Sequence, residues 1–207
     1  MNFKTVIVAD GTFPTHEIPQ KYIRDAKRII CCDGSTQNLI DFGLEPTAIV
    51  GDMDSLSEEL AIRFVDRLFA DKSQETNDLT KSVRWCITRG YKDIVIVGAT
   101  GKREDHTIGN ISLLAEYEID ANVIMVTDTG VISYLSSSSE IASFPGQQVS
   151  IFSLDPETEI TSHGLKYPLK RSKLNNWWMA TLNEAKGDSF KLEFNIGKVI
   201  VYLKFRG

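Results

Sequence analysis

The sequence lacks the features that mark several large classes of protein. It has only three cysteines in 207 residues, an odd number that gives no framework of disulfides. No apolar run approaches the roughly 18 residues that a membrane span needs. The N-terminus also has no apolar segment of the kind found in a signal peptide. These absences predict a cytoplasmic protein in a reducing compartment, without a membrane partner.

Positive charge is scarce as well. The chain carries 23 Lys and Arg against 28 Asp and Glu, for a formal net charge of −5, and has no basic block. Nucleic-acid-binding surfaces are usually basic, so we expect no nucleic-acid partner. Hydrophobic residues make up 42% of the chain, which is ordinary for a folded domain, and the length suits one large domain or two smaller ones.

The first part of the chain, up to about residue 127, alternates between strand and helix patterns. Apolar runs that predict strands stand at 3–9, 28–32, 48–50, 93–97 and 122–126. Helical periodicity appears at 35–42, 57–67, 78–89 and 105–117. The strand runs are almost continuously apolar, as in parallel strands that are covered on both faces. Repeated strand–helix units predict an α/β domain with a parallel, Rossmann-like sheet over residues 1–127.

Residues 128–207 have a different pattern. Short strand candidates stand at 131–135, 148–154, 190–194 and 198–205, separated by turn residues, and no helical periodicity appears. That pattern is typical of a small antiparallel sandwich or barrel. We therefore expect a second, all-β sandwich domain over residues 128–207.

Aspartates follow several of the expected parallel strands. Asp10, Asp33, Asp52 and Asp54 stand at or just past a strand end, and in open parallel sheets those ends form the edge where ligands bind. Neighbouring carboxylates repel each other, which favours a bound cation, and carboxylate oxygens are ligands that Mg²⁺ prefers. Aspartates also cap turns, and for Asp10 alone we favour that interpretation. For the pair Asp52 and Asp54 the pattern favours a metal site.

The segment GATGKREDHTIGN, residues 98–110, follows the fourth expected strand. Its glycines let a loop approach a ligand closely, and Lys102 and Arg103 offer cations suited to phosphate oxygens. The spacing is neither that of a P-loop nor that of a dinucleotide-binding turn. An acidic cluster opposite a basic glycine loop indicates a nucleotide bound with Mg²⁺ and phosphoryl-type transfer. Taken alone, His106 could equally be structural, and Asp78 could simply cap a helix.

The order of five segments resembles the thiamine pyrophosphokinase family. These segments are CCDGS, VGDMDS, QETNDLTK, GATGKREDHTIGN and GLKYPL, and they span nearly the whole chain. The resemblance implies an α/β domain that binds Mg²⁺ and ATP and a β-sandwich domain that binds thiamine. It also implies a homodimer with active sites at the subunit interface. The implied reaction transfers the pyrophosphoryl group of ATP to the thiamine hydroxyl and releases AMP.

The resemblance also implies roles for individual residues. The metal ligands would be Asp33, Asp52, Asp54 and Asp78. The nucleotide would be bound by Asp33, Gln74, Asn77, Arg103, His106 and Asn110. The residues acting in catalysis would be Asp52, Asp54, Asp78, Arg103 and Asp105. Thiamine would be contacted by Trp177, Trp178, Thr181 and Asn183.

The chain departs from the family pattern around the expected thiamine site. Leu182 stands where the family usually has serine, and Ala180 stands where a small hydroxyl residue is expected. Near the nucleotide, Asn77 replaces the usual threonine. Because neighbours on a strand point to opposite faces, we expect one of Trp177 and Trp178 in the sandwich core and the other free.

Two other functions remain compatible with parts of the sequence. A metal-dependent nucleotide-sugar transferase with a DxD site would explain the sheet and the Asp52–Asp54 pair, but not the Arg-x-Asp-His element of the glycine loop. A non-catalytic thiamine- or nucleotide-binding protein would explain the fold, but would have little reason to keep so many acidic side chains together.

Overall fold

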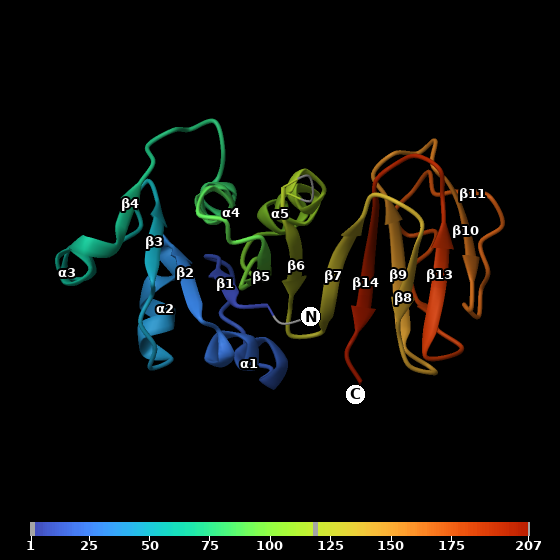
Figure 1. Cartoon of the computed structure of the whole chain (residues 1–207), viewed down its shortest axis with the longest axis horizontal. Helices are drawn as coiled ribbons and strands as arrows, with labels where there is room; N and C mark the ends of the chain where they lie inside the picture. Colours follow the sequence, from blue (N-terminus) through green and yellow to red (C-terminus); the bar gives the residue numbers. More distant parts are fainter. Residues whose placement is uncertain (1–2, 118–119, 207) are drawn as a thin grey trace. The chain divides into compact units, whose positions relative to one another are not determined.

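The structure, a computed structural model, describes residues 3–117 and 120–206. The chain divides into two units, Met1–Asp128 and Thr129–Gly207. Figure 1 identifies their helices and strands. No helix in the described part of the chain combines the length and the apolar character that crossing a membrane requires.

The first unit contains a parallel sheet in the order β6-β5-β1-β2-β3-β4. Its strands are β1 (Thr5–Val8), β2 (Arg28–Cys32), β3 (Ala48–Gly51), β4 (Leu68–Ala70), β5 (Asp93–Val97) and β6 (Asn122–Val126). The central strands are buried along almost their whole length, because helices cover both faces of the sheet. The predicted α/β fold with a parallel sheet is confirmed.

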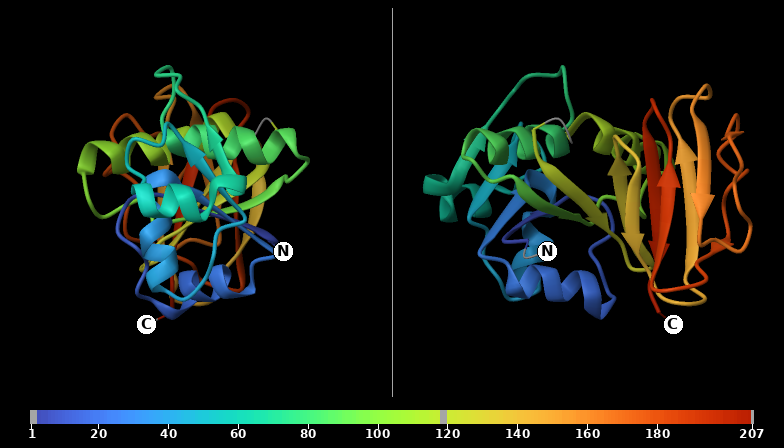
Figure 2. Two further views of the ribbon diagram at one scale, coloured as in Figure 1. Left: turned by 90° about the vertical axis from the view of Figure 1, so that its left-hand side faces the viewer. Right: turned by 45° about the vertical axis from the view of Figure 1, so that its right-hand side comes forward.

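The helices of this unit are α1 (Glu17–Asp25), α2 (Thr36–Asp41), α3 (Glu58–Arg63), α4 (Asp78–Thr88) and α5 (Glu104–Tyr117), with 3₁₀ turns η1 (Asp33–Ser35) and η2 (Val65–Arg67). Helices α1 and α2 lie on one side of the sheet, and α4 and α5 on the other (Figures 1 and 2). The strands β1 to β4 follow one another toward one edge of the sheet, and the chain then returns to place β5 and β6 on the other side of β1. The strand order therefore reverses between the neighbours β1 and β5. Ligand crevices form at the carboxyl ends of strands beside such a reversal.

Several elements of this unit differ from the sequence prediction, among them the edge strand β4, which was not expected. Helix α1 was not expected; its Pro19 lies in the first turn, where no backbone N–H is needed. The single helix expected at 57–67 is divided at Phe64 into α3 and η2. Phe64 is buried and has a backbone φ of −115°, outside the helical range.

The second unit is built from two antiparallel sheets. One has the order β12-β9-β14-β7 and the other β11-β10-β13-β8. The strands are β7 (Gly130–Leu135), β8 (Ser139–Ala142), β9 (Gln148–Ser153), β10 (Glu159–His163), β11 (Ser172–Lys173), β12 (Asn183–Glu184), β13 (Ser189–Glu193) and β14 (Val199–Lys204). Side chains from both sheets, among them Ile151, Phe190 and Val201, share one buried core. The predicted β sandwich is confirmed, although β8 and β10 to β12 were not expected.

Candidate active site

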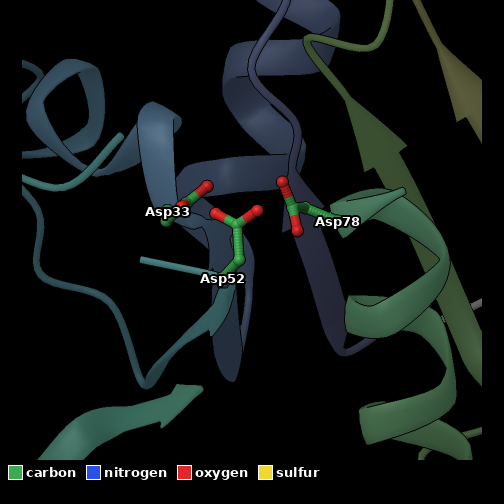
Figure 3. A group of neighbouring side chains, drawn as sticks. All are labelled: Asp33, Asp52 and Asp78. Carbon is green, nitrogen blue, oxygen red and sulfur yellow. The ribbon is translucent and has the colours of Figure 1, made fainter. Parts of the chain in front are cut away.

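Three aspartates that are far apart in the sequence meet at the carboxyl edge of the parallel sheet. Asp33 follows β2, Asp52 follows β3, and Asp78 is the first residue of α4. One carboxylate oxygen of each residue lies within 4.8 Å of the corresponding oxygen of the other two, and Figure 3 shows the three side chains close together. The donors are all carboxylate oxygens, which fit a hard cation such as Mg²⁺.

The two aspartates of the DMD segment are separated by the backbone. Met53 between them has a φ of 71°, a left-handed conformation that is uncommon outside glycine. The backbone N–H of Asp54 donates a hydrogen bond to Oδ1 of Asp52, at 3.1 Å. The side chain of Asp54 is exposed and is not part of the three-carboxylate group. Asp54 therefore holds the loop that presents Asp52, and its expected role as a metal ligand stays a prediction.

The environments of Asp33 and Asp52 shift their pKa values in opposite directions. Asp33 is only 3% exposed, and burial raises the pKa of its carboxyl, although a hydrogen bond from Gly34 N–H at 2.9 Å opposes that shift. The hydrogen bond from Asp54 N–H lowers the pKa of Asp52, helped by one from Gln74. A buried carboxyl that resists ionisation thus lies beside one that ionises readily, and a cation between them would favour the charged form of both.

Glycine is required where the backbone passes the buried carboxylate. A Cβ added at Gly51 would lie 2.8 Å from Cγ of Asp33, and one at Gly34 would lie 2.6 Å from Oδ2 of Asp10. Both distances are shorter than ordinary van der Waals contacts. The residue before Asp52 therefore has to be small for the backbone to pass Asp33, and the residue after Asp33 has to be small for the backbone to pass Asp10.

Sequence reasoning missed a buried cation in this group. Nζ of Lys81 is 2.9 Å from Oδ1 of Asp78, and the residue is 5% exposed. Burial lowers the pKa of Lys81, but the hydrogen bond to Asp78 and the charges of Asp78, Asp52 and Asp71 outweigh it and raise the pKa above its ordinary value. The only signal in the sequence is the i, i+3 spacing of Asp78 and Lys81 on a helix.

A cavity of about 310 Å³ opens beside the carboxylates. It is lined by residues that follow β1, β2 and β5 and by the first turn of α4, including Asp10, Asp33, Asp78, Lys102, Arg103, His106 and Asn110. Lys102 forms an ion pair with Asp10 at 2.7 Å. The cavity therefore has carboxylates on one part of its wall and two cations on another, as an anionic ligand carrying a metal ion requires.

The glycine loop is held together by its own side chains. Arg103 donates from Nε and Nη2 to the carboxylate of Asp105, which lowers the pKa of Asp105 to about 2. Asn110 donates to the carbonyl of Ala99 at 2.9 Å, and its Oδ1 accepts from Asn77 at 3.2 Å. Asn77 also caps α4 by accepting from Thr80 N–H. These bonds tie the start of α4 to the loop that follows β5.

In the second unit, the side chain of Asn183 forms hydrogen bonds with backbone groups of neighbouring residues. The residue is 3% exposed, and its amide bonds with Tyr167 N–H, Tyr167 carbonyl and Glu184 N–H. Thr181 donates to the carbonyl of Trp178. Contacts of Asn183 and Thr181 with thiamine stay predictions.

The prediction that one tryptophan packs in the sandwich core is wrong. Trp177 is 40% exposed and Trp178 is 71% exposed. They lie in a turn rather than in a strand, with Met179 N–H bonded to the carbonyl of Asn176. The alternation rule therefore does not apply to them. The nearby core position is filled by the small Ala180, whose carbonyl accepts from Ile151 N–H.

Comparisons with known proteins agree with this geometry. A family model described as the thiamin pyrophosphokinase catalytic domain matches residues 19–127, and one described as the substrate-binding domain of the same enzyme matches residues 130–202. The chain belongs to the thiamin pyrophosphokinase family.

Individual relatives of this family lead to the same assignment. Thiamine pyrophosphokinase of Bacillus subtilis is 31% identical over 188 residues, covering 80% of this chain and 82% of the relative. Thiamin pyrophosphokinase 1 of Caenorhabditis elegans is 25% identical, over 72% and 67% of the two chains. The crystal structure of a thiamin pyrophosphokinase family protein from Enterococcus faecalis has the same fold, with a TM-score of 0.82, 22% identity and coverage of 99% and 100%.

Proposed function

We propose that this chain is a thiamine pyrophosphokinase, which transfers the pyrophosphoryl group of ATP to the hydroxyl of thiamine and releases AMP. Membership of the family supports this function. The observation that carries it within the molecule is the convergence of Asp33, Asp52 and Asp78 beside a cavity that also presents Lys102 and Arg103. That arrangement suits a triphosphate bound together with Mg²⁺.

We assign separate tasks to the two parts of the chain. Residues 1–127 would bind ATP and Mg²⁺, and residues 128–207 would bind thiamine, with Trp177, Trp178, Thr181 and Asn183 as the contacting side chains. The exposed tryptophan rings offer aromatic faces to the cationic thiazolium. A homodimer with active sites at the subunit interface and a cytoplasmic location belong to the same proposal. The three free, buried cysteines are consistent with a reducing compartment.

In the proposed mechanism the chain mainly binds and orients the triphosphate. Mg²⁺, when bound by Asp33, Asp52 and Asp78, supplies positive charge that offsets the charge of the phosphate oxygens. Arg103 uses Nε and Nη2 to hold Asp105, which leaves Nη1 to donate to a phosphate oxygen. Gln74, Asn77, His106 and Asn110 would position the nucleotide at the edge of the cavity.

The same geometry limits the choice of a general base. The ion pair with Arg103 lowers the pKa of Asp105 to about 2, so its carboxylate has little affinity for a proton near neutral pH. Asp105 is better placed to orient Arg103 or the thiamine hydroxyl than to deprotonate it. Asp54 would act through the loop that presents Asp52.

The test is an assay of the purified protein with Mg²⁺, ATP and thiamine in which AMP and ADP are separated by chromatography. The proposal expects AMP and thiamine diphosphate in equal amounts, and no AMP without thiamine. ADP with thiamine monophosphate would show transfer of the γ-phosphoryl group alone and would overturn the proposed reaction. Thiamine binding without any product would favour the non-catalytic binding protein, while the comparisons do not favour a nucleotide-sugar transferase.

A further inference from the structure

Lys81 occupies an unusual position for a lysine. Among residues 3–117 and 120–206, Asp33 and Lys81 are the only charged residues that are fully buried. Lysine is almost never fully buried unless it is paired. Replacing a buried ion pair by apolar residues is often neutral or stabilising, so the pair of Lys81 with Asp78 is weakly explained by stability alone. The site that surrounds Lys81 offers a better explanation.

The ammonium group of Lys81 lies among carboxylates of the candidate metal site. It donates to Oδ1 of Asp78 at 2.9 Å, and the charges of Asp52 and Asp71 also act on it. The backbone N–H of Asp71 bonds to the carbonyl of Gly51, the residue before Asp52. Within the described part of the chain, no other cation forms an ion pair with Asp33, Asp52 or Asp78.

The charge balance of the group follows from these contacts. When ionised, the three carboxylates of the converging group carry a charge of −3, and one ammonium brings the total to −2; Asp71 is exposed and lies outside that group. A single divalent cation neutralises that charge, whereas a second one would leave an excess of positive charge in a partly buried place. One oxygen of Asp78 is occupied by Lys81, which fixes the carboxylate and leaves its other oxygen for a metal ion.

We infer that Lys81 is a positioning residue of the metal site, an internal counter-ion that orients Asp78 and limits the group to one resident divalent cation. Any further metal ion would have to arrive with the triphosphate of the nucleotide. The effect on turnover rests on the proposed function, but the effect on cation binding does not. The two can therefore be tested apart.

Removing the charge of Lys81 should strengthen the binding of metal and weaken turnover. Lys81→Met removes a positive charge next to a cation site, so the metal-free protein should bind Mn²⁺ more tightly, by about tenfold or more. Turnover should fall, because Asp78 loses the hydrogen bond that orients it. A lysine that serves only to fill space would lower the melting temperature without tightening the binding of metal.

The experiment is a titration of the nucleotide-free protein with Mn²⁺, in which free Mn²⁺ is followed by electron paramagnetic resonance. Mn²⁺ is chosen because it takes the same oxygen ligands as Mg²⁺. The wild type should bind one equivalent, and Lys81→Met should bind one equivalent more tightly. The metal-free variant should also melt at a lower temperature than the wild type and gain more from added Mn²⁺.

A second neutral variant of Lys81 and a control at an exposed lysine complete the test. Lys81→Gln is also neutral, and its amide can still donate to Asp78, so it serves if the methionine variant does not fold. Lys92→Met is the matched control, since Lys92 is exposed just before β5, and the Mn²⁺ affinity of this variant should equal that of the wild type. Unchanged or weaker Mn²⁺ binding in a folded neutral variant of Lys81 would overturn the inference. Two equivalents bound by the wild type would overturn the limit to one cation.

Discussion

The two ends of the parallel sheet carry charges of opposite sign: acidic side chains gather at the carboxyl end and basic ones at the amino end. At the carboxyl end, Asp33, Asp52 and Asp78 converge, and Lys81 forms an ion pair with Asp78. At the amino end, an open cavity of about 560 Å³ is lined by four cations together with uncharged groups and a single acid. The cations are Lys4, Arg28, Arg89 and Lys92, and the acid is Asp93.

The two arginines at the amino end lie over aromatic rings. The guanidinium carbon of Arg28 lies 4.0 Å from the ring centre of Tyr91, and that of Arg89 lies 3.8 Å from the ring centre of Trp85. The attraction between each guanidinium and its ring stabilises the fold and holds the arginine side chain in place. The three carboxylates at the other end share one ammonium group, that of Lys81 on Asp78, so negative charge remains there that a bound cation would neutralise in the proposed function. Charges that stabilise the fold and charges that serve a site can thus be told apart by what neutralises them.

The largest expected effect comes from removing one converging carboxylate. Asp52→Asn keeps the size of the side chain but removes one ligand charge, and metal ions contribute several kcal/mol to such reactions. We expect AMP formation to fall by about 10³-fold with an unchanged circular dichroism spectrum. Asp54→Asn is the matched change two residues away, and since Asp54 is exposed and outside the group it should cost only about tenfold. Equal losses in the two variants would contradict this distinction.

A second substitution should displace the carboxylates at the carboxyl end of the sheet without altering any charge. Gly51→Ala would place a Cβ 2.8 Å from Cγ of Asp33, which forces the carboxylates apart. Overpacking of this kind costs about 1–3 kcal/mol of stability, and turnover should fall with it. The control is Gly109→Ala within α5, where an added Cβ meets nothing within 4 Å. That variant should be neutral or more stable by about 0.5–1 kcal/mol in urea unfolding.

Asp128 also follows a parallel strand, but groups within the protein already form hydrogen bonds to its carboxylate. Its carboxylate accepts from the N–H and hydroxyl of Thr15 and from the N–H of His16. Partial burial raises the pKa of Asp128, but these hydrogen bonds outweigh it and the pKa lies below its usual value. Asp128→Asn should therefore cost about 1–2 kcal/mol of stability at pH 7.

The pH dependence of that loss follows from the direction of the shift. A lowered pKa in the folded state means that the stabilisation is complete above the unfolded pKa of about 3.9 and is lost as the pH falls through the native value. The difference between wild type and Asp128→Asn in urea unfolding should be constant from about pH 8 to pH 5 and shrink below about pH 4. A difference that grows on acidification would show that the assigned direction is wrong.

The smallest effect is expected at the amino end of the sheet. Arg89→Gln removes the guanidinium that stacks on Trp85, and an exposed contact of this type contributes about 0.5–1 kcal/mol. Thermal unfolding should shift down by a few degrees (about 2–4 °C per kcal/mol), while AMP formation stays at the wild-type rate. A loss of turnover without a loss of stability would mean that this end of the sheet also takes part in the function.

Much of the fold could be predicted because it depends on local patterns. Continuous apolar runs such as the one in β5 give parallel strands directly. Strand β4 was missed because its three residues are not buried at the sheet edge, and β10 because only Ile160 is apolar while its other buried residue, Ser162, is polar, so no apolar alternation appears. Both elements depend on pairing with distant strands, which no local pattern contains.

The candidate site could be predicted in part for the same reason. The aspartates after β2 and β3 are placed by the strands they follow, so their convergence was expected. The separation of Asp52 from Asp54 depends on the left-handed backbone of Met53, which the residue type does not suggest. Lys81 was missed because a lysine at i+3 from an aspartate is usually an exposed partner. The tryptophans were misplaced because a turn was taken for a strand.

The distribution of tryptophan gives the chain an internal pair of fluorescent reporters. Trp85 is one of three tryptophans; its indole nitrogen is buried and its ring packs on Phe69. Trp177 and Trp178, in the second unit, are exposed. Iodide added to the native protein should quench the red-shifted emission of the exposed pair and spare the blue emission of Trp85. Unfolding of the two units can then be followed separately in one denaturant titration, without a label or an engineered residue.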